Sequence, residues 1–266
     1  MLKLGFIGCG KMAGAILQGV AKSGKFPGAQ FFLSDKDATC MKKLAESCGA
    51  LAMDSNLAVA ESADVLLLCV KPGDVTAVLQ EMKPSLGGKL VISIAAGITL
   101  STLQKSAPDA TMVRVMPNTP ALVHRGATAY SLGETAGEEH AKIVEEIFSA
   151  VGFVSRVPES ALDAVTGLSG SGPAYVYTVI EALADGGVLM GLPRDLALQL
   201  AAETVIGAGE MVVQTKLHPA TLRDMVTSPG GTTIAGLEAL ENAGLRAALI
   251  GAVRSATERS VALRGK

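Results

Sequence analysis

A glycine-rich segment near the amino terminus has the spacing that binds the pyrophosphate of a dinucleotide. Gly8, Gly10 and Ala13 fit the pattern G-x-G-x-x-A, directly after an apolar run and at the start of a helical pattern. Gly8 permits a tight turn, Gly10 lets backbone N–H groups approach a phosphate, and Ala13 allows close packing of helix and strand. A tight turn alone could also use these glycines, but the strand–turn–helix context favours a nucleotide site.

The residues after the second apolar run bear on which dinucleotide would bind. Ser34, Asp35 and Lys36 stand about 20 residues beyond the glycines, where such enzymes contact the adenosine ribose. Asp35 could accept a hydrogen bond from a free 2′-hydroxyl and favour NAD. Ser34 and Lys36 could instead hold a 2′-phosphate and favour NADP. A solvated turn without any such role also fits these residues, so the sequence leaves the choice open.

Three further loops follow apolar runs and carry small, rigid or polar residues. They are Val70–Pro72, Ala95–Gly97 and Met116–Pro120, the last of which includes Asn118. Because ligands of open α/β sheets bind outside the carboxyl ends of the strands, one crevice could hold all three loops. Each loop taken singly could be an ordinary turn.

Two stretches in the second half combine glycine with hydroxyl side chains. Ser169–Pro173 and Ser228–Thr233 both precede helical patterns, and a helix N-terminus offers free N–H groups to a carboxylate or phosphate. Helix capping alone could explain Ser169–Pro173 equally well. For Ser228–Thr233 a binding role is favoured, because two threonines after Pro-Gly-Gly exceed what capping needs.

Absent residues narrow the reaction class. The second half has no Lys or His set in a small-residue helix, so a reaction that needs a strong general acid is poorly supported, and hydride delivery fits better. A hydroxyacid dehydrogenase would need a catalytic lysine within residues 169–178, and none is present. A non-catalytic, NADP-sensing protein that has kept the fold is a further alternative. Four cysteines and three scattered histidines show no metal-ligand spacing, so we expect no metal site.

Composition excludes several classes of protein. The 266 residues are 49% hydrophobic and 18% charged, which favours a globular chain with a sizeable core over a disordered one. A net charge of −2 without a basic run, and only 3% aromatic residues, argue against a nucleic-acid partner. We see neither a signal peptide nor an apolar run near the ~20 residues of a membrane span, and therefore expect a cytoplasmic protein without membrane contact.

The pattern of elements predicts an α/β fold with two domains. In residues 1–157, short apolar runs alternate with helical patterns, which predicts a Rossmann-type dinucleotide-binding domain with a mostly parallel sheet. Residues 158–266 read as helices, which we expect at Leu162–Leu168, Ala174–Met190, Arg194–Thr215, Thr232–Glu241 and Leu245–Leu263. Two of these helices are apolar on nearly all sides, which favours an all-helical dimerisation domain, although a compact monomeric bundle is the alternative.

The chain resembles the pyrroline-5-carboxylate reductase family along its whole length. The most specific block is Asp224–Ile234, preceded by His218-Pro219. The amino-terminal glycines, Val70–Pro72, Ser93–Gly97, Met116–Pro120 and Ser169–Tyr175 resemble the family's other blocks in the same order. This resemblance implies reduction of the cyclic imine 1-pyrroline-5-carboxylate to L-proline by hydride transfer from NADPH or NADH, the last step of proline biosynthesis. It also implies a homo-oligomer, either a dimer or a ring of dimers, in which a second subunit completes the site.

The expected site residues fall into two groups. Combining the resemblance with the loops above, we expect the cofactor at Ile7, Gly8, Cys9, Gly10, Lys11, Met12, Ser34, Asp35, Lys36, Asn56, Cys69, Val70, Lys71, Pro72, Ala95, Ala96, Gly97 and Asn118. We expect the substrate at Glu159, Ser228, Gly230, Gly231, Thr232 and Thr233. A protonated imine is already electrophilic, so the enzyme needs alignment more than acid–base power. The Thr233 hydroxyl is the expected catalytic group, hydrogen-bonded to the ring nitrogen, while backbone N–H groups of Gly230–Thr233 hold the substrate carboxylate.

Overall fold

The computed structural model describes residues 2–264 and divides the chain into two compact units. The first unit consists of Met1–Ser171 together with Ser255–Lys266, and the second of Gly172–Arg254. The chain therefore leaves the first unit at Ser171 and its last residues return to it. The sequence pattern instead predicts the domain boundary near residue 157, where strands are followed by helices.

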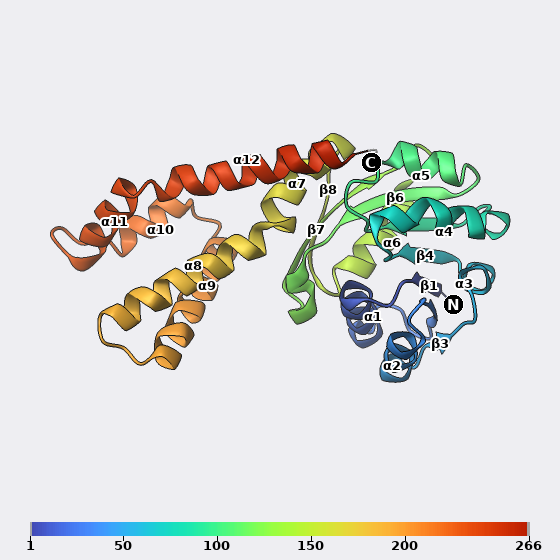
Figure 1. The fold of residues 1–266 in the computed structure, drawn as a ribbon, viewed down its shortest axis with the longest axis horizontal. Helices are drawn as coiled ribbons and strands as arrows, with labels where there is room; N and C mark the ends of the chain where they lie inside the picture. Colours follow the sequence, from blue (N-terminus) through green and yellow to red (C-terminus); the bar gives the residue numbers. More distant parts are fainter. Residues whose placement is uncertain (1, 265–266) are drawn as a thin grey trace. The chain divides into compact units, whose positions relative to one another are not determined.

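The first unit contains one mostly parallel sheet. Among the described residues its strands follow the order β3-β2-β1-β4-β5-β6-β7-β8 (Figure 1). They are β1 (Lys3–Ile7), β2 (Gln30–Ser34), β3 (Leu51–Ala52), β4 (Val65–Leu68), β5 (Leu90–Ser93), β6 (Thr111–Met116), β7 (Gly126–Leu132) and β8 (Gly152–Arg156). All neighbours pair in parallel except β6 and β7. The first six strands have the order of a Rossmann fold, which confirms the predicted fold class.

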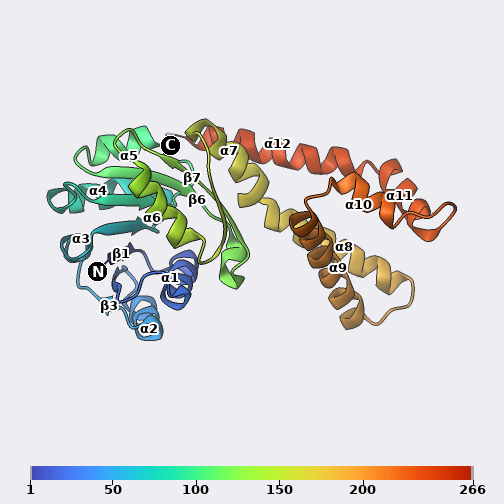
Figure 2. The ribbon, with the colours of Figure 1, turned by 180° about the vertical axis from the view of Figure 1, so that it is seen from behind.

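Helices cover both faces of the sheet (Figures 1 and 2). On one face α1 (Lys11–Ser23), α2 (Ala38–Cys48) and α6 (Glu138–Phe148) pack around a core that includes Phe6, Ile16, Tyr130 and Phe148. On the other face α3 (Asn56–Ser62), α4 (Val75–Met82) and α5 (Leu100–Ser106) enclose a second core. Short 3-10 turns lie at Pro72–Asp74, Lys83–Ser85, Thr119–Val123 and Glu159–Ala161. Burying a side chain such as Phe6 or Phe148 stabilises the folded state by roughly 1.5–3 kcal/mol. The two apolar cores together therefore hold the helices firmly against the sheet.

Four elements of the first unit were not expected from the sequence pattern. β3 has two residues, and β8 is an edge strand whose residues are only partly buried. α3 and α5 have seven residues each, too few to show a helical period, and the side chains of Ser55 and Thr99 cap them.

The second half of the chain is helical, as predicted. Its helices are α7 (Leu162–Val165), α8 (Gly172–Leu189), α9 (Arg194–Thr215), α10 (Pro219–Met225), α11 (Thr232–Asn242) and α12 (Leu245–Leu263). Two local expectations were wrong. Residues Pro219–Met225, outside the helices expected from the sequence, form α10, because His218 caps the helix by accepting a hydrogen bond from the N–H of Ala220 at 3.2 Å. The glycine-rich turn expected at Ser169–Pro173 is largely helical, because Ser169 and Gly170 belong to a π-helical turn, Thr166–Gly170, and α8 starts at Gly172. The N–H of Ser171 donates to the carbonyl of Thr166.

The second unit buries little of its apolar surface within one chain. α8 and α9 pack side by side (Figure 1), yet the fully buried residues between them are alanines: Ala184, Ala197 and Ala201. Large apolar side chains on α9 stay open, including Ile206 at 57% and Val213 at 75% exposure. By length and composition alone α9 could cross a membrane, but it carries Glu203 and Glu210, which are costly in lipid. Open apolar faces of this kind are typical of a protein–protein interface, so we expect a second copy of this unit to cover them.

A change on α9 tests this expectation. The wild-type chain should have a molar mass in solution that is a multiple of 27.1 kDa. Replacing Ile206 by Glu places a charge in a covered apolar face and should shift the mass towards that of one chain, whereas Ile206→Leu should not. Light scattering after size-exclusion chromatography measures both variants. A wild-type chain that stays monomeric at micromolar concentration would contradict the expectation.

Candidate active site

A pocket of about 370 Å³ lies at the carboxyl ends of β1, β2 and β4. Parallel pairing places these strand ends at one edge of the sheet, as open α/β sheets require of a ligand crevice. Ten residues line the pocket: Gly8, Gly10, Asp35, Lys36, Asn56, Cys69, Val70, Lys71, Asp74 and Val78. Eight of them were expected from the sequence. Asp74 and Val78 were missed, because they begin the helical segment after Lys71-Pro72 and carry no motif of their own.

The two glycines of the fingerprint have different roles. Gly8 has φ +94°, and a Cβ at this position would lie 2.8 Å from the carbonyl oxygen of Cys69. A side chain at Gly8 would therefore strain the turn and clash with the strand end beside it. Gly10 has nothing within 4 Å of where its Cβ would stand, and no side chain caps α1, which starts at Lys11 and Met12. The open space and the uncapped helix N-terminus fit a pyrophosphate.

Asp35 turns back towards the glycine-rich loop. Its Oδ2 accepts a hydrogen bond from the N–H of Cys9 at 2.5 Å, and its Oδ1 accepts one from the N–H of Asp37 at 2.7 Å. Lys36 is largely exposed and lies 3.4 Å from Asp74. The carboxylate is thus engaged by backbone, while the ammonium group is held only loosely at the mouth of the pocket.

A chain of hydrogen bonds runs beside Asp35. The buried Ser34 hydroxyl donates to Asn56 Oδ1 at 2.7 Å, and Asn56 Nδ2 donates to Glu81 at 2.8 Å. The chain fixes the orientation of the Asn56 amide, which lines the pocket. One of its N–H groups remains for a ligand.

The cysteines around the loop are packing residues. Burial and the nearby Asp35 raise the pKa of the Cys9 thiol to about 12, and burial also raises the pKa of Cys69. Cys40 Sγ donates to the carbonyl of Cys9 at 3.1 Å. Cys9 and Cys69 therefore stay protonated at neutral pH, which makes them poor nucleophiles.

The other expected cofactor loops follow β5 and β6 at the same edge of the sheet. Ala95 and Gly97 are buried, and Gly97 has φ +78°. Asn118 holds structure together, because its Nδ2 donates to Ser169 at 3.0 Å and its Oδ1 accepts from Ala127 at 2.8 Å. These residues lie outside the lining of the 370 Å³ pocket, so their cofactor role stays a prediction.

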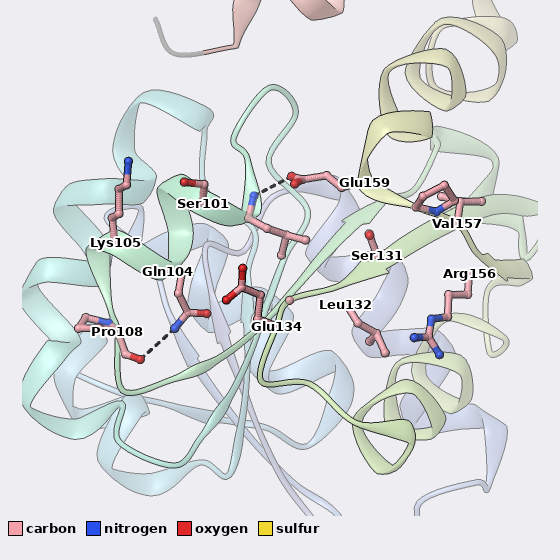
Figure 3. Close-up of a pocket in the computed structure, with 13 residues that line it drawn as sticks. Ser101, Gln104, Lys105, Pro108, Ser131, Leu132, Glu134, Arg156, Val157 and Glu159 are labelled. Atoms are coloured by element: carbon pink, nitrogen blue, oxygen red, sulfur yellow. Dashed lines mark hydrogen bonds between the residues drawn. The ribbon is translucent and has the colours of Figure 1, made fainter.

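Glu159 lies on the border of a larger cleft of about 940 Å³, beside α5 and the ends of β7 and β8 (Figure 3). It accepts a hydrogen bond from the N–H of Leu100 at 2.7 Å, drawn as a dashed line in Figure 3, and pairs with Arg114 at 3.1 Å. Arg114 is almost fully buried in β6, and burial lowers its pKa while Glu159 opposes that change. Sequence reasoning missed Arg114, although a lone arginine in an apolar strand requires a buried partner.

Glu159 lies in the first unit, whereas the other five expected substrate residues lie together at one turn and helix start in the second unit. Gly231 donates its N–H to the carbonyl of Ser228 at 3.1 Å, and Gly230 has φ +66°, so Ser228–Gly231 closes a β-turn with Pro229 at its second position. α11 starts directly after it with Thr232 and Thr233, and no side chain caps the helix. The turn therefore presents an open helix N-terminus flanked by two hydroxyl groups, which can bind a carboxylate.

Family models match both halves of the chain. A family model described as pyrroline-5-carboxylate reductase dimerisation matches residues 159–263, and one described as NADP oxidoreductase, coenzyme F420-dependent, matches residues 3–97. The pyrroline-5-carboxylate reductase of Methanosarcina acetivorans is 48% identical over 97% of this chain and 96% of its own length. That of Glycine max is 48% identical over 97% of this chain and 94% of its own length.

Solved structures show the same likeness. A pyrroline-5-carboxylate reductase from Coxiella burnetii has a TM-score of 0.93 and 35% identity, covering 99% of this chain and 98% of its own. The Plasmodium falciparum pyrroline carboxylate reductase with NADP bound has a TM-score of 0.87 and 34% identity, with coverage of 99% and 98%. With this identity over nearly the full length, the chain belongs to the pyrroline-5-carboxylate reductase family.

Proposed function

We propose that this chain reduces 1-pyrroline-5-carboxylate to L-proline by hydride transfer from NADPH, the last step of proline biosynthesis. The observation that carries the proposal is the 48% identity over 97% of the chain to an enzyme of that name. The pocket at the carboxyl ends of β1, β2 and β4 offers a place for a dinucleotide, and the uncapped N-terminus of α11 after Ser228–Gly231 offers N–H groups to a carboxylate. Both features support the proposal.

The cofactor would lie along the carboxyl edge of the sheet. The pyrophosphate would meet the N-terminus of α1 at Gly10, and the adenosine ribose would meet Ser34, Lys36 and Asn56. When bound, NADPH supplies the hydride. Asp35 already accepts two backbone N–H groups, whereas Lys36 is a cation that a 2′-phosphate attracts, so we favour NADPH over NADH.

The substrate would be held by its carboxylate and its ring nitrogen. Backbone N–H groups at the start of α11 suit the carboxylate, and the Thr233 hydroxyl would hydrogen-bond the nitrogen and position its proton. The imine needs no strong general acid, which agrees with the lack of titratable side chains in Ser228–Thr233. Ser228 and Thr232 would flank the carboxylate. Glu159, which is partly exposed, would contact the substrate as well as support the loop at Leu100.

The assembly and the location complete the proposal. A second copy would cover α8 and α9 and complete the substrate site, in a dimer or in a ring of dimers that the molar mass distinguishes. The proposed location is the cytoplasm, where thiols stay reduced, and Cys9, Cys40, Cys48 and Cys69 are all free.

The direct test is an oxidation assay with both cofactors. The purified chain is mixed with NADPH or NADH, the imine is added, and the loss of reduced-nicotinamide absorbance and the appearance of proline are followed. We expect faster imine-dependent oxidation at low NADPH than at low NADH. Cofactor binding without any imine-dependent oxidation would favour the sensor alternative instead.

Substitutions of Gly8 and Gly10 separate the effect on NADPH binding from the effect on the stability of the protein. Gly10→Val fills the open space at the α1 N-terminus and should weaken NADPH binding by at least about tenfold with little change in Tm. Gly8→Ala should also lower stability, by about 1–3 kcal/mol, because of its positive φ and the close Cys69 carbonyl. Cofactor titration and thermal melting measure the two effects. Unchanged NADPH affinity in Gly10→Val would show that the pyrophosphate does not bind at this turn.

Substitutions of Thr233 test its hydroxyl. Thr233→Ala should lower kcat by roughly 10²-fold, the scale of losing one preorganised hydrogen bond to the reacting group, while NADPH affinity stays unchanged. Thr233→Ser keeps the hydroxyl and should retain most of the activity. Steady-state kinetics with varied imine concentration gives the comparison. Equal kcat in the wild type and the Ala variant would exclude this role.

A further inference from the structure

The carboxyl-terminal end of α12 packs into the first unit. Ser255–Lys266 belong to that unit by their contacts, although α12 starts at Leu245 in the second. Ser260 is 5% exposed, on a helix whose other described residues are mostly open. A polar side chain buried at this point needs a specific partner.

Asp163 of α7 is that partner. It is 2% exposed, its Oδ1 accepts a hydrogen bond from the Ser260 hydroxyl at 2.8 Å, and its other oxygen pairs with the guanidinium of Arg264. A buried carboxylate loses its hydration and is tolerated only with such partners. The pair and the hydrogen bond therefore fix the last turn of α12.

The fixed turn lies beside the loop that follows β5. The carbonyl oxygen of Leu263 lies 3.5 Å from where a Cβ on Gly97 would stand. The far end of the same loop is held by Glu159, which accepts the N–H of Leu100 and pairs with the buried Arg114. Two carboxylate–arginine pairs thus support the two ends of residues 97–100.

In the proposed binding mode, this loop would face the part of the cofactor that reacts. In the proposed binding mode the adenosine ribose lies at the end of β2 and the pyrophosphate at the end of β1. Because the strands follow the order β2-β1-β4-β5, a cofactor that extends further along this edge places its nicotinamide half near the end of β5. Ala95–Gly97 stand at that end.

We propose that Arg264 and Asp163 are positioning residues: they hold the end of α12 against Gly97 and so fix the loop on which the nicotinamide ring lies. This inference rests on the proposed function. The C-terminal turn thereby contributes to cofactor binding without touching the cofactor.

The test compares two ligands that differ in the nicotinamide. Arg264→Met removes the charge and keeps the bulk, Arg264→Lys restores a cation, and Arg259→Met is the control, an exposed arginine on the same helix. Each full-length variant is titrated with NADPH and with 2′-phospho-ADP-ribose, which has the adenosine half and pyrophosphate but no nicotinamide. Thermal melting is recorded alongside.

We expect a loss of affinity only for the ligand that contains the nicotinamide. Arg264→Met should weaken NADPH binding by about tenfold and leave 2′-phospho-ADP-ribose binding unchanged, Arg264→Lys should recover most of the loss, and Arg259→Met should behave as the wild type. Equal weakening for both ligands, or no weakening for either, would overturn the inference. These titrations need no imine, so an inactive wild type would refute the proposed function separately.

Discussion

Parallel pairing from β2 to β6 is the constraint on which the rest of the structure depends. Because these strands run in the same direction, the loops after Ile7, Ser34, Leu68, Ser93 and Met116 all leave the sheet at one edge. Residues more than 60 positions apart, such as Gly8 and Cys69, come into contact there. A change of register by one residue would exchange the side chains that face the two cores and would misplace the loops at the strand ends. The two apolar layers that prevent this also fix the geometry of the pocket.

Buried charges impose a second constraint, because each must meet its partner from a distant element. Arg114 on β6 reaches Glu159, and Asp163 on α7 reaches Arg264 at the end of α12. Removing one member of such a pair leaves an unpaired charge in a region poor in water, which costs far more than the pair itself contributes. The pairs therefore specify where α5 and α12 dock, beyond what nonpolar packing specifies.

The sequence predicts the local features well and the long-range pairs poorly. The glycine spacing, the apolar runs of the inner strands and the long helices each depend on neighbours in the chain, and the structure contains them. The edge strand β8 and the short helices α3 and α5 lack a periodic signal, since few of their residues are buried or the element is too short. Arg114 could have been singled out as a charge within an apolar strand, but its partner Glu159 depends on how α5 and the turn after β8 pack.

The chemistry of the substrate explains which groups each of the two units has to supply. A cyclic imine is made electrophilic by its own proton, so the enzyme must align two molecules and hold one carboxylate, and needs no strong acid or base. Backbone N–H groups at helix N-termini can do most of this, at α1 for a pyrophosphate and at α11 for a carboxylate. Backbone donors require close approach, which explains why glycines stand in both turns, Gly8 and Gly10 before α1 and Gly230 and Gly231 before α11. None of the residues Ser228–Thr233 is titratable, which is what a reaction governed by alignment predicts.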